Sequence, residues 1–202
     1  MPRPDTRGAI LRAAAAVFKR KGYKATTVSD ILAEAGVARG TYYRYFSSKR
    51  HAFQELVGDL FKGIHEASLG LITGAGPMDA RLKDTFAQCY RMFIDNRGVL
   101  LTYLRDGITS DPGMYALWDD FDRRMTVLFS EVLTHCAETG EFRRVDTDLV
   151  SRAMMLLFLQ VPYRHMMGSR ADIDVELVAS EVVSLALDGL VPRAAGALPD
   201  GR

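Results

Sequence analysis

The segment that most constrains the fold of this chain runs from residue 26 to residue 49, TTVSDILAEAGVARGTYYRYFSSK. Thr27, with Asp30 three residues later, matches the signature of a helix start, in which the hydroxyl accepts a backbone N–H of the first turn. Gly36 stands where a helix needs a left-handed residue to end, and a second short helix is predicted from about Arg39 to Phe46. Two short helices joined by a glycine-containing turn predict a helix-turn-helix.

The second predicted helix has a composition suited to nucleic acid. It contains three tyrosines and two arginines within eight residues, which offer donors to phosphates and base edges together with flat apolar area. Residues 1–50 hold 11 Lys and Arg against 3 Asp and Glu, a net charge of +8, whereas residues 51–202 carry −7. A basic end on an acidic body is typical of nucleic-acid binding, although charge alone would suit a solvated basic face equally well. The helix-turn-helix decides between the two interpretations, because the second helix of this motif enters the major groove of DNA.

This segment resembles the DNA-binding domain of the TetR family of transcriptional regulators. The resemblance covers roughly the first quarter of the chain, and the remainder is similar to the family only in length and helical character. The residues that carry it are Ile10, Leu11, Ala13, Ala14, Phe18, Gly22, Tyr23, Thr26, Thr27, Ile31, Ala35, Gly36, Val37, Gly40, Thr41, Tyr42, Tyr43, Tyr45, Phe46 and Lys49.

The resemblance implies an all-α protein with two domains. Residues 1–50 would form a three-helix DNA-binding domain, with the helix-turn-helix over about 28–47, and residues 51–202 a larger helical domain for ligand binding and dimerisation. Arg39 is expected to reach base edges, where arginine pairs with guanine, and Lys49 is expected to contact phosphate. The full set of DNA contacts that the resemblance implies is Thr27, Ser29, Arg39, Gly40, Thr41, Tyr42, Tyr43, Tyr45 and Lys49.

Some residues of this region have a structural interpretation beside the functional one. Phe46 is expected to pack in the core of the small domain. For Tyr43, core packing and DNA contact are equally expected. Arg44 is expected on the surface rather than on a phosphate. The basic cluster 19–21 ends a first helix predicted at about 6–21, and we expect it to stabilise the end of that helix through the helix dipole.

Helical periodicity dominates the rest of the chain, and no alternation typical of strands occurs. A helix over residues 48–69 has a continuous apolar stripe and would link the two domains. The stretch GLITGAGP at 70–77 is the clearest linker, and 106–113 is a second break. Further helices are predicted at 78–96, 97–105, 114–139, 148–167 and 175–190, which gives about nine in all, followed by a frayed tail from Pro192.

The larger domain is rich in aromatic and methionine side chains, which line adaptable apolar pockets in proteins. Core packing is the more common role of any one of them, and it is the family resemblance that implies a pocket for a small apolar or aromatic effector. Asp122, Arg91, Gln160 and His165 could orient such a ligand. The residues expected to line the pocket are Tyr90, Phe93, Tyr103, Trp118, Phe121, Met125, Met155 and Phe158.

The last two predicted helices are apolar on more than one face, and such a helix is buried within a bundle or against a partner. In the TetR family these two helices form a four-helix interface with their copies, so the resemblance implies a homodimer. A two-fold dimer suits the motif, because two recognition helices must lie about 34 Å apart to meet successive major grooves.

No catalytic or metal-binding pattern stands out. The four histidines include no pair four residues apart, the two cysteines lack metal-type spacing, and no HExxH, GxSxG or P-loop occurs. We therefore expect no catalytic residue, metal or cofactor, and a solvated role for Asp119, Asp120 and Asp122. The longest mostly apolar run, 153–163, is too short to span a bilayer, and no secretory signal precedes it. We expect a cytoplasmic protein with reduced thiols and no membrane contact.

Together these observations predict a homodimeric DNA-binding transcriptional regulator that responds to a ligand. We expect a repressor that leaves an inverted-repeat DNA operator when a small-molecule effector binds the C-terminal domain. Three alternatives stay open: control by a protein partner, an activator role, and a helical enzyme that keeps a degenerate helix-turn-helix. A solid body without a pocket would favour the protein partner.

Overall fold

The computed structural model describes residues 5–107, 112–168 and 174–190. These residues form ten α-helices and one π-helical turn and contain no strand, which confirms the predicted all-α class. The expected tail from Pro192 lies outside the described residues. The elements are α1 (Thr6–Ala25), α2 (Val28–Ala35), α3 (Arg39–Tyr43), α4 (Lys49–Ser68), α5 (Gly70–Thr73), α6 (Met78–Asp95), α7 (Arg97–Thr102), the π-helical turn η1 (Tyr103–Gly107), α8 (Pro112–Thr139), α9 (Thr147–Met167) and α10 (Val175–Leu190).

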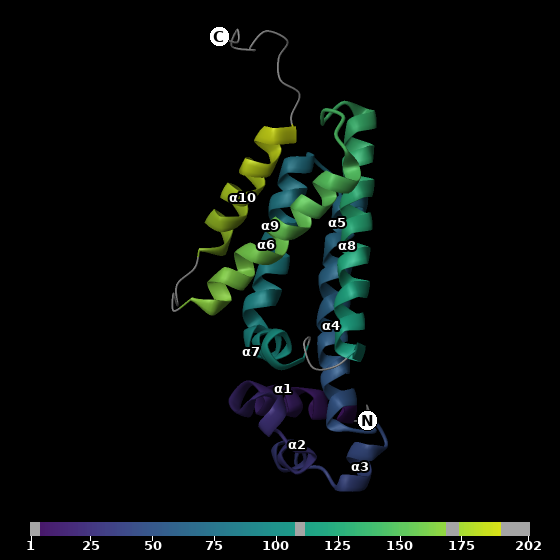
Figure 1. The fold of residues 1–202 in the computed structure, drawn as a ribbon, viewed down its shortest axis with the longest axis vertical. Coiled ribbons are helices and arrows are strands. Elements are labelled where there is room, and N and C mark those ends of the chain that lie inside the picture. The colour runs from purple at the N-terminus through teal and green to yellow at the C-terminus, as the bar shows by residue number, and fades with distance from the viewer. Residues whose placement is uncertain (1–4, 108–111, 169–173, 191–202) are drawn as a thin grey trace.

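The molecule has a small head at one end and a long helical body (Figure 1). Helices α1 to α3 form the head, and α4 runs from the head into the body, where it packs along α8 and α6. In the body, α9 packs on α8, and α10 packs on α6. The predicted linking helix is therefore confirmed, and it is the single long element shared by the head and the body.

The head folds around the features that the sequence predicts. The hydroxyl of Thr27 accepts the backbone N–H of Asp30, and the Asp30 carboxylate accepts the backbone N–H of Thr27, which completes a reciprocal cap on α2. Gly36 has φ 63° and ends α2 in the left-handed region. The core of the head is closed by large side chains that are fully or almost fully buried: Ile10, Val17, Phe18, Ile31, Tyr42, Phe46 and Phe53.

Two segments of the body differ from the prediction. The first half of the predicted linker forms α5, because Leu71 is buried and the Arg81 guanidinium donates from Nη1 to the carbonyls of Leu71 and Gly74, at 3.0 Å each. These bonds satisfy carbonyls at the end of the helix that would otherwise lack partners. The helix predicted over 97–105 ends at Thr102 and continues as the π-helical turn.

The head also contacts the body through α1 and α7. Gly98 on α7 lies so close to Lys19 that a Cβ at this position would stand 2.5 Å from the Lys19 Cγ and 2.9 Å from its Cβ. Such an approach is possible only because glycine has no side chain. The head is therefore held by α4 on one side, and by α7 with the following turn η1 on another.

Candidate DNA-binding site and effector cavity

The turn of the helix-turn-helix places the beginnings of α2 and α3 side by side. Arg39, the first residue of α3, donates from Nη2 to the Ser29 hydroxyl on α2 at 3.4 Å. Arg44 is exposed as expected. Of the residues predicted to contact DNA, six are exposed to solvent and Thr41 is half-buried; the exposed ones are Thr27, Ser29, Arg39, Gly40, Tyr43 and Tyr45.

Tyr42 does not fit the predicted contact set. Its side chain is 0% exposed, and its hydroxyl donates to the Ser48 carbonyl at 3.0 Å, directly before α4. Burial raises the pKa of this phenol to about 12. Tyr42 therefore ties α3 to α4 from within the core, as does Phe46, whose core role is confirmed.

Lys49 is also occupied within the head. Its ammonium group donates to the carbonyls of Tyr23 at 2.8 Å, Thr26 at 2.7 Å and Lys24 at 3.4 Å, and it lies 4.6 Å from the centre of the Tyr23 ring. An ammonium group has three N–H donors, so none is left for a phosphate in this arrangement. Lys49 joins the start of α4 to the end of α1, a role within the head that the sequence did not predict.

The basic cluster at the end of α1 makes ion pairs to α2 rather than serving only its own helix. Arg20 pairs with Glu34 at 2.8 Å, and Lys21 pairs with Asp30 at 2.6 Å. The bond from Lys21, followed by those from Thr27, lowers the pKa of Asp30 to about 2. The carboxylate thus stays ionised and holds both the cap of α2 and the contact to α1.

A cavity of about 620 Å³ lies in the body, within the size range of small-molecule sites. Its apolar walls come from α4, α6, α7, η1, α8 and α9, and include Phe61 of α4 and Leu104 of η1. The polar groups on its walls are Asp122, Thr126, Arg152, Gln160 and Tyr163. The cavity can therefore enclose a largely apolar molecule and bond a polar group on it.

Residues 10–56 match the model of a family described as bacterial regulatory proteins, tetR family. The chain is also 29% identical over 150 residues to the HTH-type transcriptional repressor KstR2 of Mycobacterium tuberculosis, which covers 72% of this chain and 74% of that relative. Residues 10–56 are therefore a DNA-binding domain of the TetR family of bacterial regulatory proteins. The exposed helix-turn-helix is thus that of a DNA-binding regulator.

Solved structures extend the TetR likeness beyond the head. The ketosteroid regulator KstR2 of M. tuberculosis superimposes with a TM-score of 0.70 at 23% identity and covers 95% of this chain and 97% of its own. The fatty acid degradation regulator FadR of Bacillus halodurans gives 0.77 at 21% identity, covering 93% and 97%. These likenesses show that the body as well as the head has the TetR fold.

The structure divides the predicted effector residues into three groups. Phe93, Trp118 and Met155 line the larger cavity, whereas Phe158 lines a second, smaller one. Four others lie in the core away from both cavities: Phe121 stacks on Phe61, the Tyr103 hydroxyl donates to the Met114 carbonyl, Tyr90 contacts His165, and Met125 is fully buried.

Of the polar residues expected to orient a ligand, two line the larger cavity and two do not. Asp122 and Gln160 face it, while Arg91 pairs with Glu176 and His165 contacts Tyr90. Asp119 is exposed and Asp120 pairs with Arg124 at 2.7 Å on the surface, whereas Asp122 is half-buried at the cavity wall. Other residues of the cavity wall, among them Phe61, Leu100, Leu104, Arg152 and Tyr163, were not predicted, because no motif distinguishes them from ordinary helix residues.

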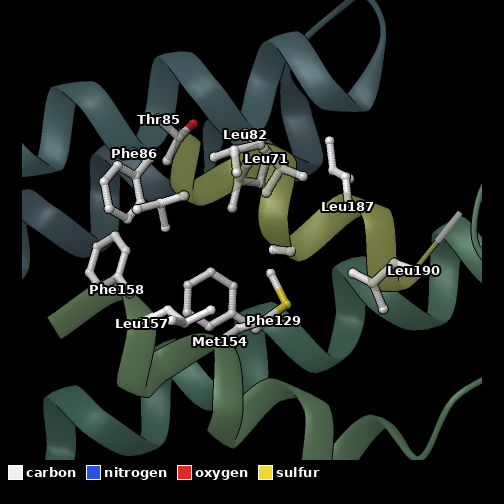
Figure 2. A pocket seen from close by; sticks show the side chains of 13 residues that line it. Leu71, Leu82, Thr85, Phe86, Phe129, Met154, Leu157, Phe158, Leu187 and Leu190 are labelled. Carbon is white, nitrogen blue, oxygen red and sulfur yellow. The ribbon is translucent and has the colours of Figure 1, made fainter. Parts of the chain in front are cut away.

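The smaller cavity, of about 50 Å³, separates α10 from α8 and α9 (Figure 2). Its walls are apolar except for Thr85. An apolar void of this kind stays dry, and its volume is far below that of a typical effector site. In the described parts of the chain, no group of three or more His, Cys, Asp and Glu side chains could hold a metal, and no helix could cross a membrane.

Proposed function

We propose that this protein is a repressor that binds an inverted-repeat operator as a homodimer and releases it when a small apolar or aromatic effector occupies the larger cavity. The observation that carries the proposal is the composition of the cavity wall. The wall includes side chains from the elements of the body that hold the head, namely α4, α7 and η1. A ligand in the body would therefore touch the supports of the DNA-binding domain.

Arg39 is the residue we propose for base recognition. It stands at the start of the exposed second helix of the motif, and the hydrogen bond that its guanidinium group donates to Ser29 is 3.4 Å long and easily exchanged. Arginine at such a position can bind a guanine with two hydrogen bonds, which discriminates against other bases by about 1–3 kcal/mol. Ser29, Thr27, Thr41, Tyr43 and Tyr45 would contact phosphates and sugars, and Gly40 would allow close approach of the backbone.

The proposed route from cavity to head has two branches. Phe61 lies on α4. The first residue of α4 is Lys49, whose ammonium group binds the Tyr23 carbonyl of α1. Leu100 lies on α7, and Leu104 on the turn that follows, while Gly98 of the same helix is packed against Lys19 of α1. An effector that displaced α7 or α4 would change the orientation of the head and hence the spacing of the two heads in a dimer.

The mechanism is a population shift. An effector that binds more tightly to the form with wrongly spaced heads reduces operator occupancy. The size of the reduction is set by the difference between its affinities for the two forms. A shift from 1:99 to 99:1 requires about 5.5 kcal/mol of such a difference. An apolar ligand that fills a large part of a 620 Å³ cavity buries enough surface to supply several kcal/mol.

The relatives favour an apolar effector. KstR2 is named a ketosteroid regulator, and FadR a fatty acid degradation regulator. Both names refer to molecules that are mainly hydrocarbon, which suits the walls of the larger cavity here. The cavity also favours a small molecule over the alternative of a protein partner, which needs no internal space.

Selection of bound DNA from a pool of random duplexes tests the proposal. We expect the wild type to enrich an inverted repeat, and Arg39→Ala to relax the preference at one position in each half-site. Lys62→Ala, at an exposed position midway along α4, removes the same charge and should leave the selected sequence unchanged. Enrichment of no sequence by the wild type, or of an unchanged sequence by Arg39→Ala, would contradict the proposal.

A further inference from the structure

The two cavities of the body follow one another along the same helices. On α8, Thr126 lines the larger cavity, and Phe129, about one turn later, lines the smaller one. On α6, Phe93 lines the larger cavity, and Phe86, about two turns earlier, lines the smaller one. Both steps lead away from the head (Figure 1). The smaller cavity therefore lies where the larger one would continue between α6 and α8.

Phe158 of α9 stands between the two cavities. Its ring centre lies 5.9 Å from that of Phe93, on the wall of the larger cavity. It also lies 5.8 Å from the ring of Phe129 and 6.0 Å from that of Phe86, both on the wall of the smaller cavity. All three pairs meet edge to face, and Figure 2 shows Phe158 and Phe86 at one end of the smaller cavity. The Phe158 ring thus belongs to a partition between them.

The surroundings of Phe158 allow its ring to move. A side chain in a close-packed core has no empty space to turn into, whereas Phe158 borders a cavity. Two methionines of the same helix lie nearby in the chain, with Met155 on the wall of the larger cavity and Met154 on that of the smaller. Methionine side chains are flexible and refill irregular gaps. The partition can therefore open without displacing a helix.

The two cavities offer different chemistry. The larger one carries polar groups on its wall, among them Arg152 and Gln160, whereas the wall of the smaller one is apolar except for Thr85. A volume of about 50 Å³ is too small for a whole effector, yet one water-sized group needs only about 10–15 Å³. The smaller cavity therefore suits the end of a narrow hydrocarbon chain and excludes a ring system.

We propose that Phe158 is a gate between the two cavities, and that the effector is a molecule with one polar end and an unbranched hydrocarbon chain. The polar end stays in the larger cavity, and the last carbons of the chain displace the Phe158 ring and enter the smaller cavity. This inference rests on the proposed function for the role of the larger cavity. It narrows the effector to a chain-like molecule, and it makes the smaller cavity the part of the site that measures chain length.

Ala186→Met tests the inference from the far side of the gate. Ala186 of α10 lines the smaller cavity and not the larger one, so a methionine there fills the space assigned to the chain end. The control is Ser184→Met, at a half-buried position of the same helix that lines neither cavity. Circular dichroism confirms that each variant is folded. Calorimetric titration with unbranched primary alcohols from hexanol to dodecanol then gives the affinity as a function of chain length.

Each methylene group that is buried on binding strengthens the affinity by about fourfold. We expect the affinity of the wild type to rise in this way until the smaller cavity is full. Ala186→Met should match the wild type for the shortest alcohols and stop gaining affinity sooner. With about two methylene groups left unburied, it should bind the longest alcohols about tenfold more weakly than the wild type does. Ser184→Met should follow the wild type over the whole series.

Phe158→Leu tests the gate itself. Leucine keeps the wall apolar but removes the ring that meets Phe93, Phe129 and Phe86. A long chain then has no ring to displace, whereas a short one never reaches it. The ratio of the affinity for the longest alcohol to that for the shortest should therefore rise severalfold above the wild-type ratio.

Three results would overturn the inference. The first is an Ala186→Met series parallel to that of the wild type, with the same change or none at every chain length. The second is an unchanged ratio of affinities in Phe158→Leu, and the third is a wild type that binds no alcohol of the series. None of these measurements involves DNA, so operator selection by the wild type distinguishes a failure of this inference from a failure of the proposed function.

Discussion

The head and the body of this protein use their side chains in opposite ways. In the head, three polar side chains are fixed by specific partners: Tyr42 by the Ser48 carbonyl, Lys49 by three carbonyls, and Asp30 by Lys21 and Thr27. The body has a cavity of about 620 Å³ and a bare apolar surface instead. The head is fixed by directed contacts, while the body leaves an internal cavity and exposed apolar side chains.

This contrast predicts that truncation of a side chain lowers the free energy of unfolding far more in the core of the head than on its exposed surface. Tyr42→Ala should lower the free energy of unfolding by about 3–5 kcal/mol, as for other large aromatic side chains in a core. The adjacent Tyr43→Ala, at a position 47% exposed, should cost below about 1 kcal/mol. Urea unfolding followed by circular dichroism measures both, and Trp118 emission follows the body separately. Equal losses would show that the head is not closed around Tyr42.

The second largest effect is expected at the junction of the head with α4. Lys49→Met keeps the apolar stem but leaves the carbonyls of Tyr23 and Thr26 without their donor, at a cost of about 1–3 kcal/mol. Lys24→Met removes the same charge from an exposed position nearby and serves as the control. We expect Lys49→Met to weaken binding to all DNA sequences more than the control does. Comparable affinities for the two variants would indicate that Lys49 acts only through its charge.

The sequence predicted the head better than the body, and the reason is physical. The cap of α2, the left-handed Gly36 and the apolar face of α4 depend on neighbours within a few residues, so a local pattern contains the whole signal. The roles of Tyr42 and Lys49 depend on partners contributed by another helix. The family resemblance implied that both residues contact DNA. Only the structure shows that their polar atoms form hydrogen bonds to backbone carbonyls within the head.

In the body the same limit applies to the cavity. Phe93 and Phe121 are both inward-facing aromatics on amphipathic helices, yet one lines the cavity and the other stacks on Phe61. Periodicity predicts that a residue faces inward and does not predict what meets it there. Packing among six elements decides which inward residues line a void, so a single sequence could not separate them.

Added volume should be tolerated in the body and harmful in the head. Leu104→Trp extends a larger side chain into the cavity, so we expect a change in unfolding free energy below about 1 kcal/mol. The same variant should bind Nile red, a neutral apolar dye that probes the cavity, about tenfold more weakly than the wild type does. Ala52→Leu, at a fully buried position in α4, should cost about 1–3 kcal/mol through overpacking. Undiminished dye binding by Leu104→Trp would place the ligand outside this cavity.

The smallest expected effect is a difference between the head and the body in how stability depends on pH. The pKa of Asp30 is lowered to about 2 in the folded head, against about 3.9 for an unfolded chain. A depressed pKa stabilises the fold above the unfolded value, so this contribution is complete above about pH 4 and disappears as the pH falls from about 4 to about 2. Asp30→Asn should therefore melt below the wild type at pH 7, with the difference narrowing towards pH 2.

Asp148 in the body is the matched control for this pH dependence. Its pKa is lowered by the adjacent Arg152, one turn away on the same helix, and the pair joins no separate elements. Asp30, in contrast, joins α1 to α2 and also caps α2. Asp148→Asn should thus lower the melting temperature less than Asp30→Asn does at pH 7. The reverse order would mean that fixed partners in the head contribute no more to its stability than a solvated pair on a single helix.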